Sequence, residues 1–164
     1  MSIVITGNPG VGKHTITQQI ADKIKLSIID INKIAKDSGL FAKNDDTNDI
    51  DVEKLEKILE QKFSDNNVIV GHLAPYVLRK NQVKIMIVLR RSPYDLIPVY
   101  KDRKYSDKKI IDNTGSEIWG IKAKEASTKF KEKTFQINVS GKTVAEMLEK
   151  IMSIIVNKEG NEEL

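Results

Sequence analysis

One short segment near the N-terminus constrains the fold of this 164-residue chain more than any other feature. Residues 7–13 read Gly-Asn-Pro-Gly-Val-Gly-Lys and fill the G-x-x-x-x-G-K frame of a phosphate-binding loop. An apolar, β-branched run (residues 3–6) precedes the loop, and a segment with one apolar helical face (Ile16, Ile20, Ile24) follows it. This order of strand, loop and helix is the context that the frame requires, so we expect a P-loop nucleotide site.

The loop predicts a binding surface made largely of backbone. Its glycines let N–H groups turn toward phosphate oxygens, Lys13 reaches the β and γ phosphates of ATP, and the following helix points its positive N-terminus at the same anion. We expect the Lys13 ammonium to be solvated while the site is empty. The residues expected to bind ATP in this part of the chain are Asn8, Gly10, Val11, Gly12, Lys13, His14 and Thr15.

Position 14 departs from the frame, because His14 stands where a Mg²⁺-ligating hydroxyl is usual. This argues against a GTPase-like site. Thr15 supplies a hydroxyl one residue later, and the loop then resembles that of nucleoside monophosphate kinases. The resemblance implies that Mg²⁺ arrives with ATP and is held mostly by phosphates and water, with Thr15 as a weak ligand. His14 is either a phosphate donor or a solvent-facing residue of the first helical turn.

Strand-like and helix-like segments alternate along the rest of the chain. The apolar patterns predict further strands at 27–30, 68–70, 85–89 and 134–139, and helices at 52–63, 94–103, 106–128 and 144–156. Such alternation is typical of an α/β protein, here a P-loop NTPase fold whose five-stranded parallel sheet carries helices on both faces. We expect one kinase domain over residues 1–156, followed by a polar, frayed tail at 157–164.

Composition excludes several classes of protein. The chain has no cysteine, which excludes disulfide frameworks, thiolate zinc sites and cysteine nucleophiles. Its apolar runs are too short to span a bilayer and it begins without the features of a secretion signal, so we expect a cytoplasmic protein that does not enter a membrane. Only four of the 27 basic residues are arginines, and three of them lie between 90 and 103. They are either a second phosphate-binding locus or ordinary surface arginines.

Beyond the loop, several ordered anchors resemble the small adenylate kinase family of archaea and the eukaryotic nucleus, the sixth adenylate kinase isoenzyme. The resemblance covers roughly residues 2–155. Its anchors are the loop itself, then Val68-Ile69-Val70 followed by a histidine, Val88-Leu89-Arg90, and residues 103–110. Members of this family also act in small ribosomal subunit maturation.

The resemblance implies roles for several segments and residues. Residues 30–53 would enclose the monophosphate, and residues 102–112 would form a short lid over ATP. Arg103 would be the lid arginine that neutralises charge on the migrating phosphoryl group, while Arg90 would face the monophosphate or that phosphoryl group. Together with Lys13, these two arginines are the expected catalytic residues.

Three further positions carry weaker expectations from the same resemblance. Lys142, in Ser140-Gly141-Lys142, would belong to the adenine-side loop and bind ATP. Asp30 and His72 would join Arg90 in binding the monophosphate, although Asp30 also fits a strand-ending turn and His72 also fits a structural role.

The family usually has an acidic residue at the end of the third strand, but here Gly71 precedes His72. We therefore expect weak Mg²⁺ binding without nucleotide. Asp30 is either a water-mediated replacement or a residue of the strand-ending turn, and Gly71→Asp is expected to strengthen metal dependence if the backbone tolerates it.

The function implied is transfer of phosphate from ATP to AMP, which yields two ADP. Alternatives are an ATPase assembly factor with little kinase turnover and another small-metabolite kinase. The family implies a small-subunit ribosomal protein and rRNA as partners, and an acidic face would dock the basic protein. Its residues are Asp45, Asp46, Asp49, Asp51 and Glu53, with Asp51 also expected to cap a helix. We expect a monomer, and the residues do not distinguish AMP from other monophosphates.

Overall fold

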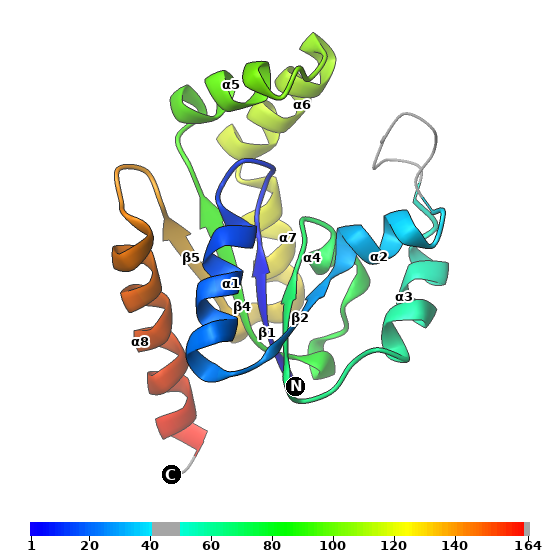
Figure 1. The fold of residues 1–164 in the computed structure, drawn as a ribbon, viewed down its shortest axis with the longest axis vertical. Helices are drawn as coiled ribbons and strands as arrows, with labels where there is room; N and C mark the ends of the chain where they lie inside the picture. The colour runs from blue at the N-terminus through cyan, green and yellow to red at the C-terminus, as the bar shows by residue number, and fades with distance from the viewer. Residues whose placement is uncertain (41–49, 163–164) are drawn as a thin grey trace.

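Five parallel strands form one sheet at the centre of the computed structural model (Figure 1). The structure describes residues 1–40 and 50–162. The strand order is β2-β3-β1-β4-β5, which places the strand before the P-loop in the middle, and every pairing is parallel. The strands are β1 (Ser2–Thr6), β2 (Ser27–Asp30), β3 (Asn67–Val70), β4 (Val83–Arg90) and β5 (Thr134–Asn138). The expected five-stranded parallel sheet is confirmed.

Helices cover both faces of this sheet, as expected. On one face, Ile3 and Ile5 of β1 pack in a core shared with α1 (Lys13–Ile24) and α8 (Val144–Glu162). The intervening Val4 points to the opposite face, because successive side chains of a strand alternate. The helices of that face are α2 (Ile31–Asp37), α3 (Val52–Glu60), α4 (Ala74–Val77) and α7 (Ile121–Phe130).

Two more helices lie beyond the carboxyl edge of the sheet, above the P-loop in Figure 1. They are α5 (Pro93–Asp102) and α6 (Asp107–Ile118), and the expected lid, 102–112, spans their junction. Tyr100 and Tyr105 stack there with ring centroids 5.3 Å apart, and the Ser106 hydroxyl caps α6 by accepting from the Lys109 N–H. In the described part of the chain, no helix combines the length and apolar content needed to cross a membrane.

Several expected helix boundaries are wrong. The helix expected at 106–128 is two helices, because Gly120 between α6 and α7 is left-handed (φ 61°) and an added Cβ there would lie 3.2 Å from the Arg90 guanidinium. The short helices α2 and α4 were not expected, nor were the 3₁₀ turns η2 (Lys80–Gln82) and η3 (Lys131–Lys133).

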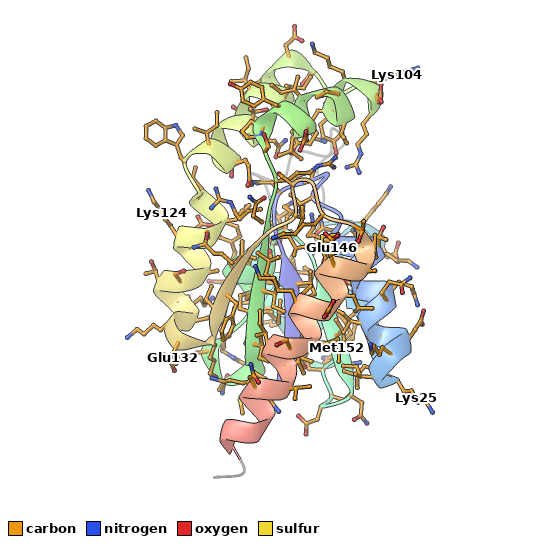
Figure 2. The ribbon with its side chains drawn as sticks, turned by 90° about the vertical axis from the view of Figure 1, so that its left-hand side faces the viewer. Lys25, Lys104, Lys124, Glu132, Glu146 and Met152 are labelled. Atoms are coloured by element: carbon orange, nitrogen blue, oxygen red, sulfur yellow. The ribbon has the colours of Figure 1, made fainter. Side chains whose placement is uncertain are left out.

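The tail expected to be frayed, 157–164, is helical as far as Glu162, where α8 ends. A reciprocal cap begins this helix: the Glu146 N–H donates to the Thr143 hydroxyl (3.2 Å), and the Thr143 N–H donates to the Glu146 carboxylate (3.3 Å). Glu146 and Met152 mark the first half of α8 in Figure 2.

Candidate functional site

The loop between β1 and α1 has the backbone conformation that phosphate binding requires. Gly12, the N-cap of α1, is left-handed (φ 93°), and an added Cβ would meet no atom within 4 Å, so conformation alone favours glycine there. Gly7 (φ 147°) is restricted by packing as well, because its Cβ would lie 2.7 Å from the Leu89 carbonyl oxygen. No acidic residue lies in the first turn of α1, which leaves the positive end of this helix uncompensated.

Lys13 is buried rather than solvated, so that expectation is wrong. Its side chain folds back over the loop, and Nζ donates to the Asn8 carbonyl oxygen at 3.0 Å. Burial lowers the pKa of Lys13 to about 7, with the positive charges of Arg103 and Lys122 acting in the same direction. A phosphate anion beside Lys13 would raise this pKa again, because a nearby negative charge favours the protonated amine.

Side chains from distant parts of the chain hold the loop from outside. Tyr100 of α5 donates to the Pro9 carbonyl oxygen at 2.6 Å, and Arg91 donates to that of Gly10 at 2.8 Å. The Asn8 side chain is 1% exposed and donates to Glu117. Asn8 was expected to bind ATP, but its amide supports the loop, and only its backbone remains for phosphate.

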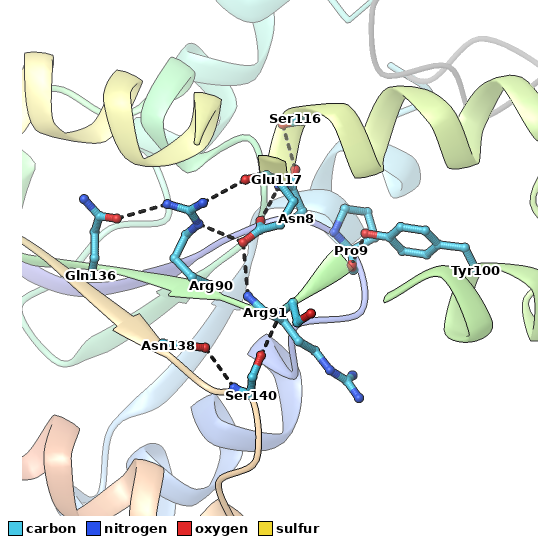
Figure 3. A network of polar contacts seen from close by, with 11 residues as sticks. Asn8, Pro9, Arg90, Arg91, Tyr100, Ser116, Glu117, Gln136, Asn138 and Ser140 are labelled. Carbon is cyan, nitrogen blue, oxygen red and sulfur yellow. Dashed lines mark hydrogen bonds and ion pairs between the residues drawn. The ribbon is translucent and has the colours of Figure 1, made fainter. Parts of the chain in front are cut away.

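Glu117, at the end of α6, is the centre of this support (Figure 3). Its carboxylate, 3% exposed, accepts from Asn8 Nδ2 (2.7 Å), Arg90 Nε (2.7 Å) and the Arg91 N–H (3.1 Å). Ser116 adds a hydrogen bond from its hydroxyl to Asn8 Oδ1 at 3.1 Å. One carboxylate thus joins the P-loop, the end of β4 and the helix that follows the lid.

Arg90 therefore has a different role from the one expected. Besides its contact with the Glu117 carboxylate, its NH2 donates to the Glu117 carbonyl oxygen (2.7 Å) and its NH1 to Gln136 Oε1 (3.1 Å). All three guanidinium nitrogens are occupied, and in Figure 3 the group points toward β5 and away from the P-loop. In this arrangement, Arg90 links Glu117 to β5, and its expected contact with a phosphate stays a prediction.

A groove of about 670 Å³ opens on the other side of this wall, at the carboxyl ends of β4 and β5. Its lining includes Arg91, Ser92, Asn138 and Ser140 together with the Arg90–Glu117 pair. Lys142 is not among its lining residues; it lies in the next loop, exposed, with Nζ on the Asn138 carbonyl oxygen at 2.9 Å. The expected adenine-side loop is thus beside a groove, although Lys142 itself faces solvent.

Arg103, the expected lid arginine, lies at the junction of α5 and α6. It ends α5 as its C-cap, it is exposed, and its charge reaches Lys13 strongly enough to lower the pKa of that amine. The Arg103 charge thus acts on the same amine that the P-loop encloses.

His14, Thr15 and Asp30 lie at the start of α1 and the end of β2. His14 Nε2 is 2.9 Å from Asp30 Oδ2, while Asp30 Oδ1 accepts from the Lys33 N–H and caps α2. Burial alone would raise the pKa of Asp30, but the hydrogen bonds from His14 and Lys33 outweigh it and lower the pKa. Asp30 is thus both a helix cap and the polar partner of the His14 ring.

The described residues contain no group of three or more histidine, cysteine or carboxylate side chains that could hold a metal. Both Asp30 oxygens are engaged, and Thr15 is exposed in the first turn of α1. The expected role of Thr15 as a weak Mg²⁺ ligand stays a prediction.

His72 is a neutral, half-buried histidine. Burial lowers its pKa to about 3, and the charges of Lys13, Lys122 and Lys109 add to the effect. The Asn32 amide nitrogen lies 2.5 Å from His72 Nδ1. Asn32 Oδ1 is buried and has no hydrogen-bond partner among the described residues. His72 thus has a structural partner in Asn32.

Gly71→Asp is expected to destabilise the protein rather than to strengthen metal dependence. An added Cβ would lie 2.9 Å from Asn32 Oδ1 and 3.0 Å from Ile31 Cβ, and φ is 157°. We expect the free energy of unfolding to fall by about 2–3 kcal/mol in urea denaturation. Gly71→Ala should lower the free energy of unfolding by a similar amount. Gly115→Ala is the control and should not lower it, because its Cβ meets open space. A stable Gly71→Asp protein with tight Mg²⁺ binding would contradict this account.

Part of the acidic segment lies outside the described residues, namely Asp45, Asp46 and Asp49. Of the rest, Asp51 is the N-cap of α3 and accepts from the Lys54 N–H at 3.1 Å, which confirms its expected capping role. Glu53 is exposed in the first turn of the same helix. Both carboxylates lie where the positive N-terminal end of a helix favours negative charge.

Comparison with known proteins identifies the family. A family model described as an AAA domain matches residues 3–120, more than half of the chain. A protein of Methanocaldococcus jannaschii named "Putative adenylate kinase" is 31% identical over 163 residues, which are 96% of this chain and 88% of the relative. A protein of Pyrococcus furiosus with the same name is 30% identical over 156 residues, 94% and 84% of the two chains. The chain belongs to the small archaeal adenylate kinase-like family.

Solved structures agree with the fold of this adenylate kinase-like family member. Shikimate kinase from Bacteroides thetaiotaomicron superposes with a TM-score of 0.64 at 17% identity, over 94% of this chain and 98% of that one. A gluconokinase from Sinorhizobium meliloti 1021 has the same TM-score at 14% identity, over 99% and 95%. At this identity the likeness shows the P-loop NTPase fold and nothing finer.

Proposed function

We propose that the protein transfers the terminal phosphoryl group of ATP to a nucleoside monophosphate, with AMP as the first candidate and two ADP as products. The observation that carries the proposal is the buried Lys13 ammonium of the P-loop, together with Arg103 at the junction of α5 and α6, whose charge acts on Lys13. The names of the relatives support the same reaction.

The arrangement supports catalysis by alignment and charge compensation. The loop N–H groups and Lys13 would hold the phosphates of ATP, and Arg103 would neutralise charge on the migrating phosphoryl group. Mg²⁺, bound through the phosphates, supplies further charge neutralisation. The phosphate of AMP has a second pKa of about 6, so it is mostly ionised at neutral pH and no general base is required.

The groove beside Glu117 is the candidate site for the base of ATP. It begins where Arg91 meets the Gly10 carbonyl, and it extends between the ends of β4 and β5. Polar side chains such as Asn138 and Ser140 line it. A nucleotide lying across this wall would place its phosphates in the loop and its base in the groove.

The test is a screen of acceptors with purified protein, ATP and Mg²⁺. We expect ADP to form faster when AMP is present. The rates with other monophosphates and with phosphate-free acceptors, compared with the rate with AMP, give the acceptor preference. ADP production that does not depend on any acceptor would favour the alternative, an ATPase linked to small ribosomal subunit maturation. That alternative rests on the family resemblance.

Arg103→Ala is expected to lower turnover by about 10²- to 10³-fold while changing the KM for ATP by less than about threefold. The reason is that an exposed lid arginine meets the phosphoryl group mainly in the closed, reacting state. Steady-state kinetics at saturating AMP measures both constants. Lys101→Ala, which removes another exposed cation from α5, is the matched control and should retain turnover. A large rise in KM with unchanged turnover would refute the assigned role.

A further inference from the structure

Arg91, the first residue after β4, lies beside both the P-loop and the groove. Its backbone N–H donates to the Glu117 carboxylate, whereas its side chain leaves that network and points away from the Arg90 guanidinium (Figure 3). The residue is half-buried, and its NH1 donates to the Gly10 carbonyl oxygen at 2.8 Å. One end of the Arg91 guanidinium is therefore fixed against the P-loop.

The charge of Arg91 has no carboxylate partner in the described part of the chain. Arg79 and Arg90 each have one, at 2.6 and 2.7 Å respectively. Within residues 1–40 and 50–162, the one hydrogen bond of the Arg91 guanidinium is to the neutral carbonyl of Gly10, which leaves Nε and NH2 without a partner there. A half-buried guanidinium with this much unused capacity suits a ligand in the groove that it lines.

The contact with Gly10 places the guanidinium on the outer side of the P-loop. The peptide between Gly10 and Val11 is trans, so the Gly10 carbonyl points opposite to the Val11 N–H. That N–H is one of the loop groups expected to face the phosphates, and the carbonyl then faces outward. Arg91 shares the lining of the groove with Pro93 and Ile118, and the Ile118 side chain is 61% exposed. The groove thus combines a flat cation with apolar surface.

We propose that the Arg91 guanidinium stacks on the base of the nucleotide whose phosphates lie in the P-loop. The inference rests on the proposed function, in which ATP is the donor, and it names a residue that favours ATP over bare phosphates. A guanidinium is planar, weakly hydrated and attracted to the faces of rings, whereas an ammonium is a hydrated point charge. The hydrogen bond to Gly10 fixes the guanidinium at the border between the loop and the groove.

The test measures the dissociation constants of ATP and of inorganic tripolyphosphate by calorimetry at one Mg²⁺ concentration. Tripolyphosphate has three phosphates and no base, so it reports on the loop alone. We expect Arg91→Ala to weaken ATP binding about 5- to 20-fold. Binding of tripolyphosphate should change by less than about twofold, because Tyr100 and Asn8 still anchor the loop. Arg79→Ala is the matched control and should change neither constant, because Arg79 lies before the start of β4 and Arg91 directly after its end.

Arg91→Lys separates stacking from charge. Lysine keeps the positive charge and a donor for the Gly10 carbonyl but has no planar group, so its affinity for ATP should stay closer to that of Arg91→Ala than to that of wild type. This variant also keeps the proposal testable if Arg91→Ala folds poorly in thermal denaturation. Wild-type ATP affinity in Arg91→Lys would overturn the proposal in favour of a phosphate contact. Equal losses for ATP and tripolyphosphate in Arg91→Ala would overturn it in favour of support for the loop.

These measurements are independent of the acceptor, because binding is measured without AMP. Unchanged ATP affinity in Arg91→Ala, alongside AMP-dependent formation of ADP by wild type, would overturn the role of Arg91 while the proposed function stands. A selective loss of ATP affinity in Arg91→Ala, alongside no use of any monophosphate by wild type, would overturn the proposed function and support the contact with the base.

Discussion

Replacing Lys13 with methionine is expected to reduce phosphoryl transfer by on the order of 10³-fold, because the ammonium is the charge that meets the β and γ phosphates. The same change should stabilise the empty protein. Lys13 is 6% exposed, and burial holds its pKa near 7, so methionine of similar length removes a desolvated amine from the folded state. Loss of activity would then accompany a gain in stability, which separates a functional defect from misfolding.

The stability gain of Lys13→Met should depend on pH in a defined direction. The folded-state pKa is about 7 and the usual value is 10.5, so the penalty on the wild type is fully present below pH 7 and disappears as the pH rises through 10.5. Urea denaturation should show the variant about 2–4 kcal/mol more stable at pH 6, with the difference shrinking toward pH 10. Lys23→Met, which removes an exposed lysine from the same helix, is the control. A pH-independent difference would show that Lys13 is not desolvated.

Glu117→Ala is the second large effect that we expect. The side chains of Glu117 and Arg90 are 3% and 27% exposed, and alanine would leave the Asn8 amide, Arg90 and the Arg91 N–H without their shared acceptor. We expect a loss of about 3 kcal/mol in the free energy of unfolding, at the lower end for a broken buried pair because Arg90 retains some solvent. The KM for ATP should also rise at least tenfold, since the Asn8 anchor of the P-loop is lost.

Glu117→Gln separates the charge from the hydrogen bonds. Glutamine retains one acceptor oxygen, so it should lose roughly half as much stability as alanine and retain more affinity for ATP. Glu149→Ala, which removes an exposed carboxylate from α8, should change neither quantity. If Glu117→Ala retained both wild-type stability and wild-type KM, Glu117 would have no part in holding the loop.

The strands and the loop were predictable because their signals are local. Val68 to Val70 is apolar throughout, as a strand covered on both faces must be, and the glycines and Lys13 stand at fixed spacing. The cap at Asp51 was predictable for the same reason. By contrast, the short helix α4 has four residues and no periodic pattern to detect. The break at Gly120 was missed because a single glycine does not by itself end a predicted helix. Only the structure shows that Arg90 lies against this position and that its backbone is left-handed.

The errors in the site came from contacts between distant residues. Arg90 was expected at the phosphates because its type and position suit them, but Glu117, 27 residues later, occupies it. Lys13 was expected in solvent because the sequence does not show that Asn8 and the surrounding elements enclose it.

The shared carboxylate at the end of α6 also limits how this enzyme type can diversify. Glu117 holds the P-loop through Asn8 on one side and lines the groove on the other. Under the proposed function, in which the groove takes the base of ATP, this one side chain would set the register between the two ends of the nucleotide. A mutation at Glu117 would then change base binding and phosphate binding together, whereas other lining residues such as Asn138 and Ser140 would offer a route to a different base.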